Sequence, residues 1–289
     1  MNKNYMSKTL VILGNGFDLD LGWKTSYSDF YKEKQHKFES FKGMSYVHEM
    51  ITEGHWYNLE GYLRDCMGEV PSEKIEELNY FWIFCRNTIG DYLSQHNIYT
   101  TITDSCAYRL LSEISSSNIV SFNYTNPFDI IGLNKHDILY VHGCLKDRLT
   151  GAEIKLGVDS DIRSQNELAS VQDKLKCIIK IHENHNIDKF HTLTKNADNI
   201  IIYGHSLGIT DSDYFKPILK SIIENRVVNK TIYIVTYNEA SLQCIKDNIL
   251  EYGISYSDLL LSNVNLQTIF TSKGKNDLDF CNMLNNIEL

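Results

Sequence analysis

The chain has 289 residues, 43% of them hydrophobic, which is enough to bury a full core. Its 37 Asp and Glu outnumber 28 Lys and Arg, giving a formal net charge of −9. This acidic balance disfavours stable binding to nucleic acid or an anionic membrane surface. No apolar stretch approaches the roughly 18 residues of a membrane span, and the start does not resemble a signal peptide. We therefore expect a cytoplasmic protein without a membrane or nucleic-acid partner.

Six short runs rich in β-branched and aromatic residues predict strands. Each run is almost continuously apolar, which favours a parallel sheet covered by helices on both faces. The expected fold class is α/β, a doubly wound, mostly parallel sheet of Rossmann type. The runs are Thr9–Leu13, Ile119–Tyr124, Ile138–Val141, Asn199–Tyr203, Thr231–Tyr237 and Val264–Phe270.

The chain contains three prolines and no Gly/Ser-rich tract, so we expect one α/β domain over residues 1–289. About a hundred residues separate the first two predicted strands, far more than a crossover needs. Apolar residues recur at helical spacing from Ile75 to Leu93 within this stretch. The sequence therefore predicts a helical insertion over residues 27–117, and a second, smaller one over 160–196.

Two more helices are expected in the last third of the chain. Apolar residues share one helical face from Pro217 onward. Another apolar face follows Asn238, a residue type that commonly caps a helix N-terminus.

A glycine motif, Gly14-Asn15-Gly16-Phe17, follows the first predicted strand. In an open parallel sheet this edge binds ligands, and glycines let backbone amides approach a pyrophosphate. Leu19 replaces the third small residue of the dinucleotide fingerprint, and no acidic strand end follows about 20 residues later, which argues against an ordinary dehydrogenase. A tight turn without a ligand is the alternative.

A second glycine motif, Gly204-His205-Ser206-Leu207-Gly208, follows a predicted strand and resembles the nucleophile elbow of a serine esterase. That fold needs a histidine after the serine, and none of the ten histidines lies beyond His205. We therefore expect a ligand-contacting loop. Asp211 could hold a ligand hydroxyl or cap the next helix.

Asn123 and His142 each follow a predicted strand, so in a parallel sheet both lie on the same rim as the glycine motifs. A histidine there is a candidate general base, and an asparagine can orient water or a sugar hydroxyl. Ordinary turn residues are an equally good interpretation of the spacing alone.

The cysteines and remaining histidines do not indicate a metal site. Seven cysteines without a C-x-x-C pair are typical of reduced cytosolic thiols. His182, His185 and His191 cluster in sequence, but the first two are one residue too close for the H-E-x-x-H pattern. We expect no metal.

Several blocks together resemble the AbiH family of bacterial abortive-infection proteins. That resemblance implies defence against phage, with a phage-derived trigger as a possible partner. The blocks are Leu13–Asp18 with Thr25, Ser26, Tyr27 and Phe30, then Phe122–Thr125, Val141–Gly143, Tyr203–Asp211, and the pair Trp56 and Glu60.

The order of the motifs is also similar, more distantly, to sirtuin-like domains that cleave NAD. That resemblance implies that His142 acts as the base and that Asn123 holds ribose or water. Two positions depart from the pattern: Asp18 stands where a small hydroxyl residue is usual, and Thr125 where an Asp is usual. The zinc-binding cysteine pairs of deacetylases are missing, so deacetylation is not expected.

The expected function is hydrolysis of the N-glycosidic bond of NAD or a related nucleotide, which would be a substrate and not a cofactor. Asn123 and His142 would act with Asp18 or Asp211, which would stabilise positive charge or hold a hydroxyl. A non-catalytic nucleotide sensor is the main alternative, ahead of an esterase or a nuclease. The expected binding residues are Gly14, Asn15, Gly16, Phe17, Thr25, Gly204, His205 and Ser206.

Overall fold

The computed structural model describes residues 8–41, 43–44, 59–69, 71–114, 117–132, 137–145, 154–157, 186–224 and 230–287. A six-stranded, all-parallel sheet with the order β3-β2-β1-β4-β5-β6 forms its centre. This is the strand order of a doubly wound Rossmann fold, as predicted. The strands are β1 (Thr9–Leu13), β2 (Asn118–Ser121), β3 (Ile138–Tyr140), β4 (Asn199–Tyr203), β5 (Lys230–Thr236) and β6 (Val264–Phe270).

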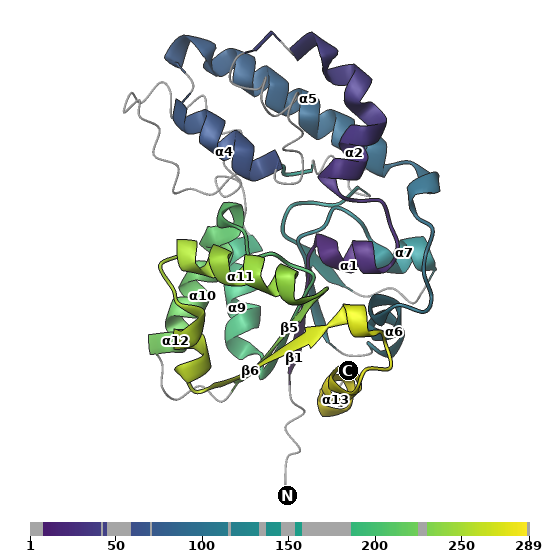
Figure 1. Ribbon diagram of the computed structural model, residues 1–289, viewed down its shortest axis with the longest axis vertical. Coiled ribbons are helices and arrows are strands. Elements are labelled where there is room, and N and C mark those ends of the chain that lie inside the picture. Colours follow the sequence, from purple (N-terminus) through teal and green to yellow (C-terminus); the bar gives the residue numbers. More distant parts are fainter. Residues whose placement is uncertain are drawn as a thin grey trace, which may run out of the picture.

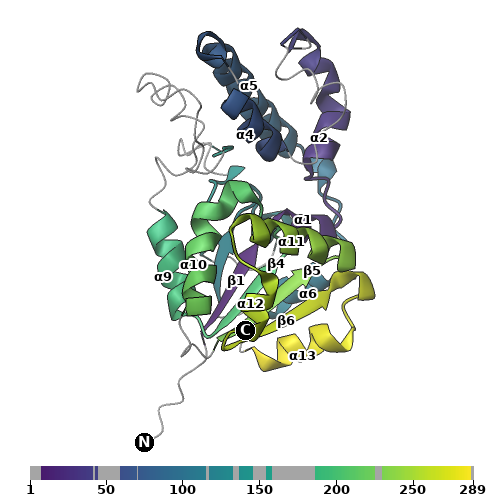
Figure 2. The ribbon, with the colours of Figure 1, turned by 60° about the vertical axis from the view of Figure 1, so that its left-hand side comes forward.

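Helices cover both faces of the sheet. Successive residues of each strand point to opposite sides, so the apolar strands present side chains to the helices on both faces. Leu10 and Ile12 of β1 pack with α9 (Asn186–Asn196), α10 (Ser212–Glu224), α11 (Glu239–Glu251) and α12 (Tyr256–Leu261). Val11 and Leu13 face the opposite layer (Figures 1 and 2). That layer consists of α1 (Asn15–Asp20), α6 (Cys106–Glu113), α7 (Pro127–Ile131) and α13 (Leu278–Asn286).

The region between β1 and β2 is helical and builds a separate apolar core beyond the end of the sheet (Figure 1). Its largest buried side chains include Phe30, Phe38, Trp82 and Tyr92. The predicted range 27–117 also encloses α6, which packs on the sheet, and its bounds stay a prediction. The elements are α2 (Tyr27–Lys34), η1 (Gln35–Phe41), α4 (Leu59–Glu69), η3 (Ser72–Lys74), α5 (Ile75–Leu93) and η4 (His96–Ile98).

Most of the smaller insertion predicted over 160–196 lies outside the described residues, and its end forms α9. Helix α11 begins as predicted after Asn238, whose side chain accepts from the Ser241 amide at 3.0 Å. Helix α10 begins five residues before Pro217, because Tyr214 and Phe215 are buried against the sheet and extend the helix. In the described part of the chain, none of the helices combines the length and apolar character of a membrane span.

Candidate functional site

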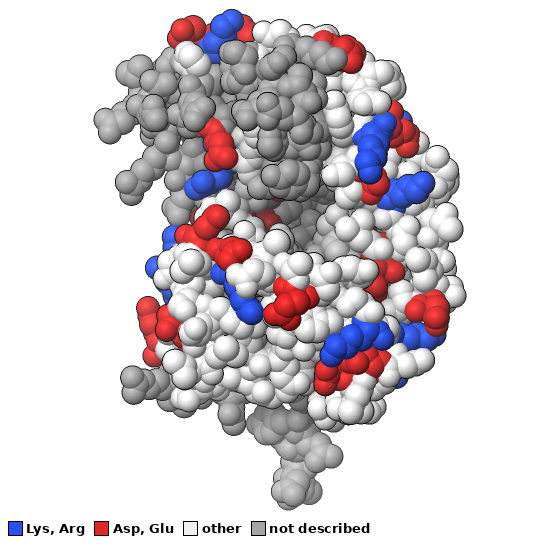
Figure 3. All heavy atoms as spheres, viewed as in Figure 1, with Lys and Arg blue, Asp and Glu red and all other residues white. Residues whose placement is uncertain are grey.

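A cavity of about 710 Å³ lies where the carboxyl ends of β1 to β4 meet the inserted helices. The surface is hollowed between these two parts (Figure 3). In an open α/β sheet, ligands bind at this edge, where the strand order reverses between β1 and β4. The cavity is lined by every predicted site residue except Phe17, namely Gly14, Asn15, Gly16, Asp18, Thr25, Asn123, His142, Gly204, His205, Ser206 and Asp211.

The two glycine turns are packed backbone to backbone. A Cβ at Gly14 would lie 2.5 Å from the His205 Cα, and one at Gly204 would lie 2.3 Å from the Phe17 nitrogen. Gly204 also adopts a φ of 63°, a conformation that side chains disfavour. The close contact between the two turns is therefore the main reason why Gly14 and Gly204 must be glycine.

Three amides of the first glycine turn are bonded within the protein. Gly14 donates to the Tyr203 carbonyl at 2.9 Å, Gly16 to the Gly204 carbonyl at 2.8 Å, and Phe17 to the Gly14 carbonyl at 2.9 Å. Three of the four amides of the motif therefore already have an acceptor, and among the described residues none is bonded to the Asn15 amide. The approach of these amides to a pyrophosphate stays a prediction. The Phe17 side chain is fully buried and meets the Tyr203 ring edge to face at 5.1 Å.

Asn123 joins the end of β2 to the first glycine turn. Its side-chain nitrogen donates to the Gly14 carbonyl at 3.0 Å and to Asp18 Oδ1 at 2.9 Å. The Gly14 carbonyl can only accept, so this contact identifies the nitrogen of the amide. Among the described residues, no donor bonds its Oδ1, and Asn123 lines the cavity. Asn123 thus offers an oriented acceptor to a ligand.

Asp18 lies behind Asn123. Its Oδ1 accepts from Asn123, and its Oδ2 accepts from the Thr125 hydroxyl at 2.7 Å. The side chain is 1% exposed, and burial raises its pKa to about 7, although the hydrogen bonds from Thr125 and Asn123 oppose the shift. Both oxygens of Asp18 therefore have partners, and the bond to Asn123 fixes the orientation of that amide.

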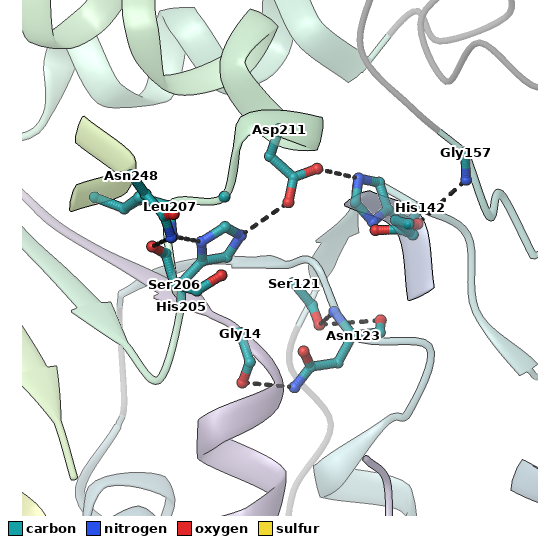
Figure 4. Close-up of polar contacts among 12 residues, drawn as sticks. Gly14, Ser121, Asn123, His142, Gly157, His205, Ser206, Leu207, Asp211 and Asn248 are labelled. Carbon is teal, nitrogen blue, oxygen red and sulfur yellow. Dashed lines mark hydrogen bonds and ion pairs between the residues drawn. The ribbon is translucent and has the colours of Figure 1, made fainter. Parts of the chain in front are cut away.

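Asp211 lies between two histidines, His142 and His205 (Figure 4). Its Oδ1 is 3.2 Å from His142 Nε2, and its Oδ2 is 3.5 Å from His205 Nε2. All three residues are less than a tenth exposed, and the ring of Phe122 meets both imidazoles edge to face. The carboxylate thus faces a histidine from each of two strand ends.

Ser206 differs from an esterase nucleophile. The residue is exposed, and no hydrogen bond within the described structure links its hydroxyl to a histidine. The neighbouring His205 instead uses Nδ1 to accept from the Leu207 amide at 2.9 Å. A serine without a base is not activated, so Ser206 remains a binding candidate.

Thr25 and Asn15 meet at another part of the cavity lining, where the Thr25 hydroxyl donates to Asn15 Oδ1 at 2.7 Å. This bond links the first glycine turn to the residues that precede α2. Ser26 caps α2 by accepting from the Asp29 amide at 3.0 Å. These contacts place α2 beside the first glycine turn.

The inserted helices supply lining residues that the sequence analysis did not include in the site. Tyr27 of α2 is hydrogen-bonded to Tyr124, and burial, with the charge of Glu60 on α4, raises the pKa of both phenols well above the usual range. Glu60 accepts from the Gly157 amide at 3.2 Å. All three residues lie in the sequence blocks that resemble AbiH proteins, and this was the signal available for them. Trp56, paired with Glu60 in that resemblance, lies outside the described residues.

The charged lining of the cavity is mostly acidic. Arg64 of α4 is the one Lys or Arg that the described residues contribute. The carboxylates are Asp18, Glu60, Asp65, Asp211 and Glu251.

No group of three or more potential metal ligands occurs among the residues that the structure describes. Of the three clustered histidines, His182 and His185 lie outside those residues. His191 contacts the Tyr214 carbonyl at 3.2 Å through Nε2.

A comparison with protein families now adds to the geometry. The family described as Bacteriophage abortive infection AbiH matches residues 72–233, more than half of the chain. The chain belongs to this AbiH family. The match covers the end of β2, the end of β3 and the loop after β4, so Asn123, His142 and Asp211 all lie within it. No curated protein and no solved structure shows significant similarity to this AbiH chain.

Proposed function

We propose that this AbiH-family protein acts in abortive infection by hydrolysing the N-glycosidic bond of NAD or a related nucleotide. One observation carries the proposal: His142, Asp211 and Asn123 meet in a single cavity at the switch point of a Rossmann-ordered sheet. That point is the usual nucleotide position in such sheets, and the three side chains supply a base, its carboxylate partner and a hydroxyl acceptor.

Asn123 orients the ribose or the attacking water. Its nitrogen is held by Gly14 and Asp18, so only Oδ1 is left to accept a hydroxyl hydrogen. Asp18 fixes the amide with Thr125 as its second partner. In this arrangement Asp18 is a positioning residue: it orients Asn123 and does not itself contact the ribose.

His142 accepts the proton released by water. An ionised Asp211 is best satisfied when His142 Nε2 carries its hydrogen, which leaves the lone pair of the neutral ring on Nδ1. The bond from the ribose to the pyridinium nitrogen breaks, its electron pair stays on that nitrogen, and neutral nicotinamide leaves. Water oxygen then bonds the ribose carbon and transfers one proton to Nδ1.

The acidic lining suits the charge that develops in this reaction. As the base departs, the ribose acquires oxocarbenium character, and nearby carboxylates such as Asp211 and Glu60 stabilise positive charge. Three of the four glycine-turn amides are already bonded within the protein, so the phosphates need a further partner, and Arg64 is the candidate among the described lining residues.

The deciding experiment follows nicotinamide release from NAD by the purified full chain. We expect cleavage by the wild type and a loss of about 100-fold or more in kcat for His142→Gln. His191→Gln is the matched control, because His191 carries the same substitution outside the cavity lining. Full activity of His142→Gln would overturn the assignment of the base.

The sensor alternative gives a different result in the same samples. If neither protein cleaves NAD but NAD raises the melting temperature of the wild type, the cavity binds a nucleotide without hydrolysing it. That outcome would overturn the proposed hydrolysis but would support NAD as a ligand of the cavity.

A further inference from the structure

The loop after β4, residues 204–208, is held in a strained shape by α11. Leu207 has a φ of 53°, a left-handed conformation that costs a side-chain-bearing residue about 1 kcal/mol. Tyr252, which follows α11, donates its hydroxyl to the Leu207 carbonyl at 2.6 Å. Asn248 of α11 donates to the Ser206 carbonyl at 2.8 Å (Figure 4). These bonds keep the Leu207 amide pointing back at His205.

That amide determines where His205 carries its proton. A backbone N–H can only donate, so His205 Nδ1, at 2.9 Å, must accept through its lone pair. The hydrogen of the neutral ring is therefore on Nε2, which faces Asp211 Oδ2 at 3.5 Å. The ring is 6% exposed and lies against Phe122 and Phe215, with centroid distances of 4.5 and 4.7 Å.

We propose that His205 is a positioning residue: its Nε2–H holds Asp211 so that the other carboxylate oxygen faces His142 Nε2, which keeps the lone pair of His142 on Nδ1. This inference rests on the proposed function for its catalytic consequence. Its structural part, the tautomer of His142, does not depend on the identity of the ligand.

The same geometry favours a role for His205 that needs no direct bond to the ligand. Both ring nitrogens already face protein atoms, Nδ1 the Leu207 amide and Nε2 the Asp211 carboxylate. A ligand hydroxyl or phosphate has no ring nitrogen of His205 left to bind. The effect of His205 on catalysis must pass through Asp211.

Two variants separate the two contacts of His205, the hydrogen bond from the Leu207 amide and the 3.5 Å approach to Asp211. In His205→Asn, the amide lies near the position of Nδ1 and can still accept from Leu207, but it does not reach Asp211. In His205→Gln, the amide nitrogen reaches the position of Nε2 and can still donate to Asp211. We expect His205→Asn to lower kcat about 10- to 100-fold with KM within about twofold, and His205→Gln to keep kcat within about threefold.

The kinetic result overturns the proposal if KM rises in both variants while kcat is unchanged, because that pattern is expected of a direct ligand contact. Equal losses of kcat in both variants, with equal losses of melting temperature, would also overturn it, because they would indicate a general structural role.

A second measurement needs no substrate. Imidazole ¹⁵N resonances distinguish a ring protonated on Nε2 from one protonated on Nδ1, and the His142 signals are assigned by their loss in His142→Gln. With the full-length protein, we expect His142 to carry its proton on Nε2 in the wild type and in His205→Gln, and to show both tautomers in His205→Asn. An unchanged His142 tautomer in His205→Asn would overturn the proposal even if NAD is cleaved. The expected change would support it even if NAD is not cleaved.

Discussion

At the scale of single residues, the two departures from the sirtuin-like pattern are hydrogen-bonded to one another. Asp18 and Thr125 exchange the residue types expected at their positions, and the Thr125 hydroxyl donates to Asp18 at 2.7 Å. A carboxylate and a hydroxyl therefore still meet, but each comes from the position at which the other is usual. The two departures from the pattern are therefore in direct contact with each other.

Asp18 should make stability depend on pH. Burial raises its pKa from 3.8 to about 7, so the folded protein retains this proton at pH values where the unfolded chain has lost it. The group's contribution is fully present below pH 3.8 and is lost as the pH rises through 7. For a side chain this deeply buried, the loss is on the order of 4 kcal/mol.

Asp18→Asn removes this titration but keeps both hydrogen bonds, because the Asn oxygen can accept from Asn123 and its nitrogen can donate to Thr125. We expect the free energy of unfolding of the variant, relative to the wild type, to increase by roughly 3 kcal/mol between pH 5 and pH 8. Urea unfolding followed by circular dichroism at the two pH values measures this. The same difference at both pH values would contradict the raised pKa.

From the sequence, the site residues could be placed only at the carboxyl edge of the sheet, without their contacts. Strand ends in a parallel sheet converge, which brought Gly14, Asn123, His142 and Ser206 together correctly. Hydrogen-bond partners could not be predicted, because they depend on contacts across more than a hundred residues. The amide of Gly16 is taken by Gly204, for example, and nothing in the local glycine motif distinguishes that acceptor from a phosphate.

At the scale of elements, four of the six strands have the predicted first residue and three have both predicted ends. Continuous β-branched runs define the strands well, because both faces of this sheet are buried. The predicted end of β2 was three residues too late. Phe122, Asn123 and Tyr124 are apolar or aromatic enough to resemble strand, but the chain leaves the ladder after Ser121 so that Asn123 can reach Gly14.

The contact between the two glycine turns can be tested with a pair of substitutions. Gly204 and Gly253 both have positive φ, 63° and 75°, but a Cβ at Gly253 has no atom within 4 Å. Gly253→Ala should therefore cost only the backbone strain, about 1 kcal/mol. Gly204→Ala should cost about 1–3 kcal/mol more, because its Cβ meets the backbone of Phe17.

Chemical denaturation of both glycine variants measures the difference in their free energies of unfolding. Nicotinamide release should fall in Gly204→Ala and stay near the wild-type level in Gly253→Ala. Equal destabilisation by the two substitutions would mean that the turns have room to separate.

At the scale of the whole molecule, the cavity joins two bodies that have separate apolar cores. The sheet edge supplies Asn123 and His142, and the inserted helices supply Tyr27 and Glu60. The sequence indicated the insertion by the number of residues between two predicted strands. That number does not determine where the inserted helices pack relative to the sheet. The placement of α2 and α4 over the sheet edge could only come from the packed structure.

A ligand in this cavity should protect both bodies at once. We expect NAD, or ADP-ribose as a non-cleavable probe, to slow amide hydrogen exchange in α4 and in residues 204–208 by a comparable factor. The exposed helix α12, which does not line the cavity, is the internal control. Protection of the loop alone would contradict a site shared with the insertion.

The pairing of β1 with β4 also bears on when the site can form. Thr9 pairs with Asn199, and Gly14 bonds the Tyr203 carbonyl, so the glycine turn near the start of the chain meets its partner only after some 190 further residues. Such distant contacts close large loops and form late in folding. During synthesis, the first two-thirds of the chain therefore lacks Asp211 and the whole loop after β4. We expect a nascent chain to be unable to bind a ligand in this cavity until β4 and that loop have been made.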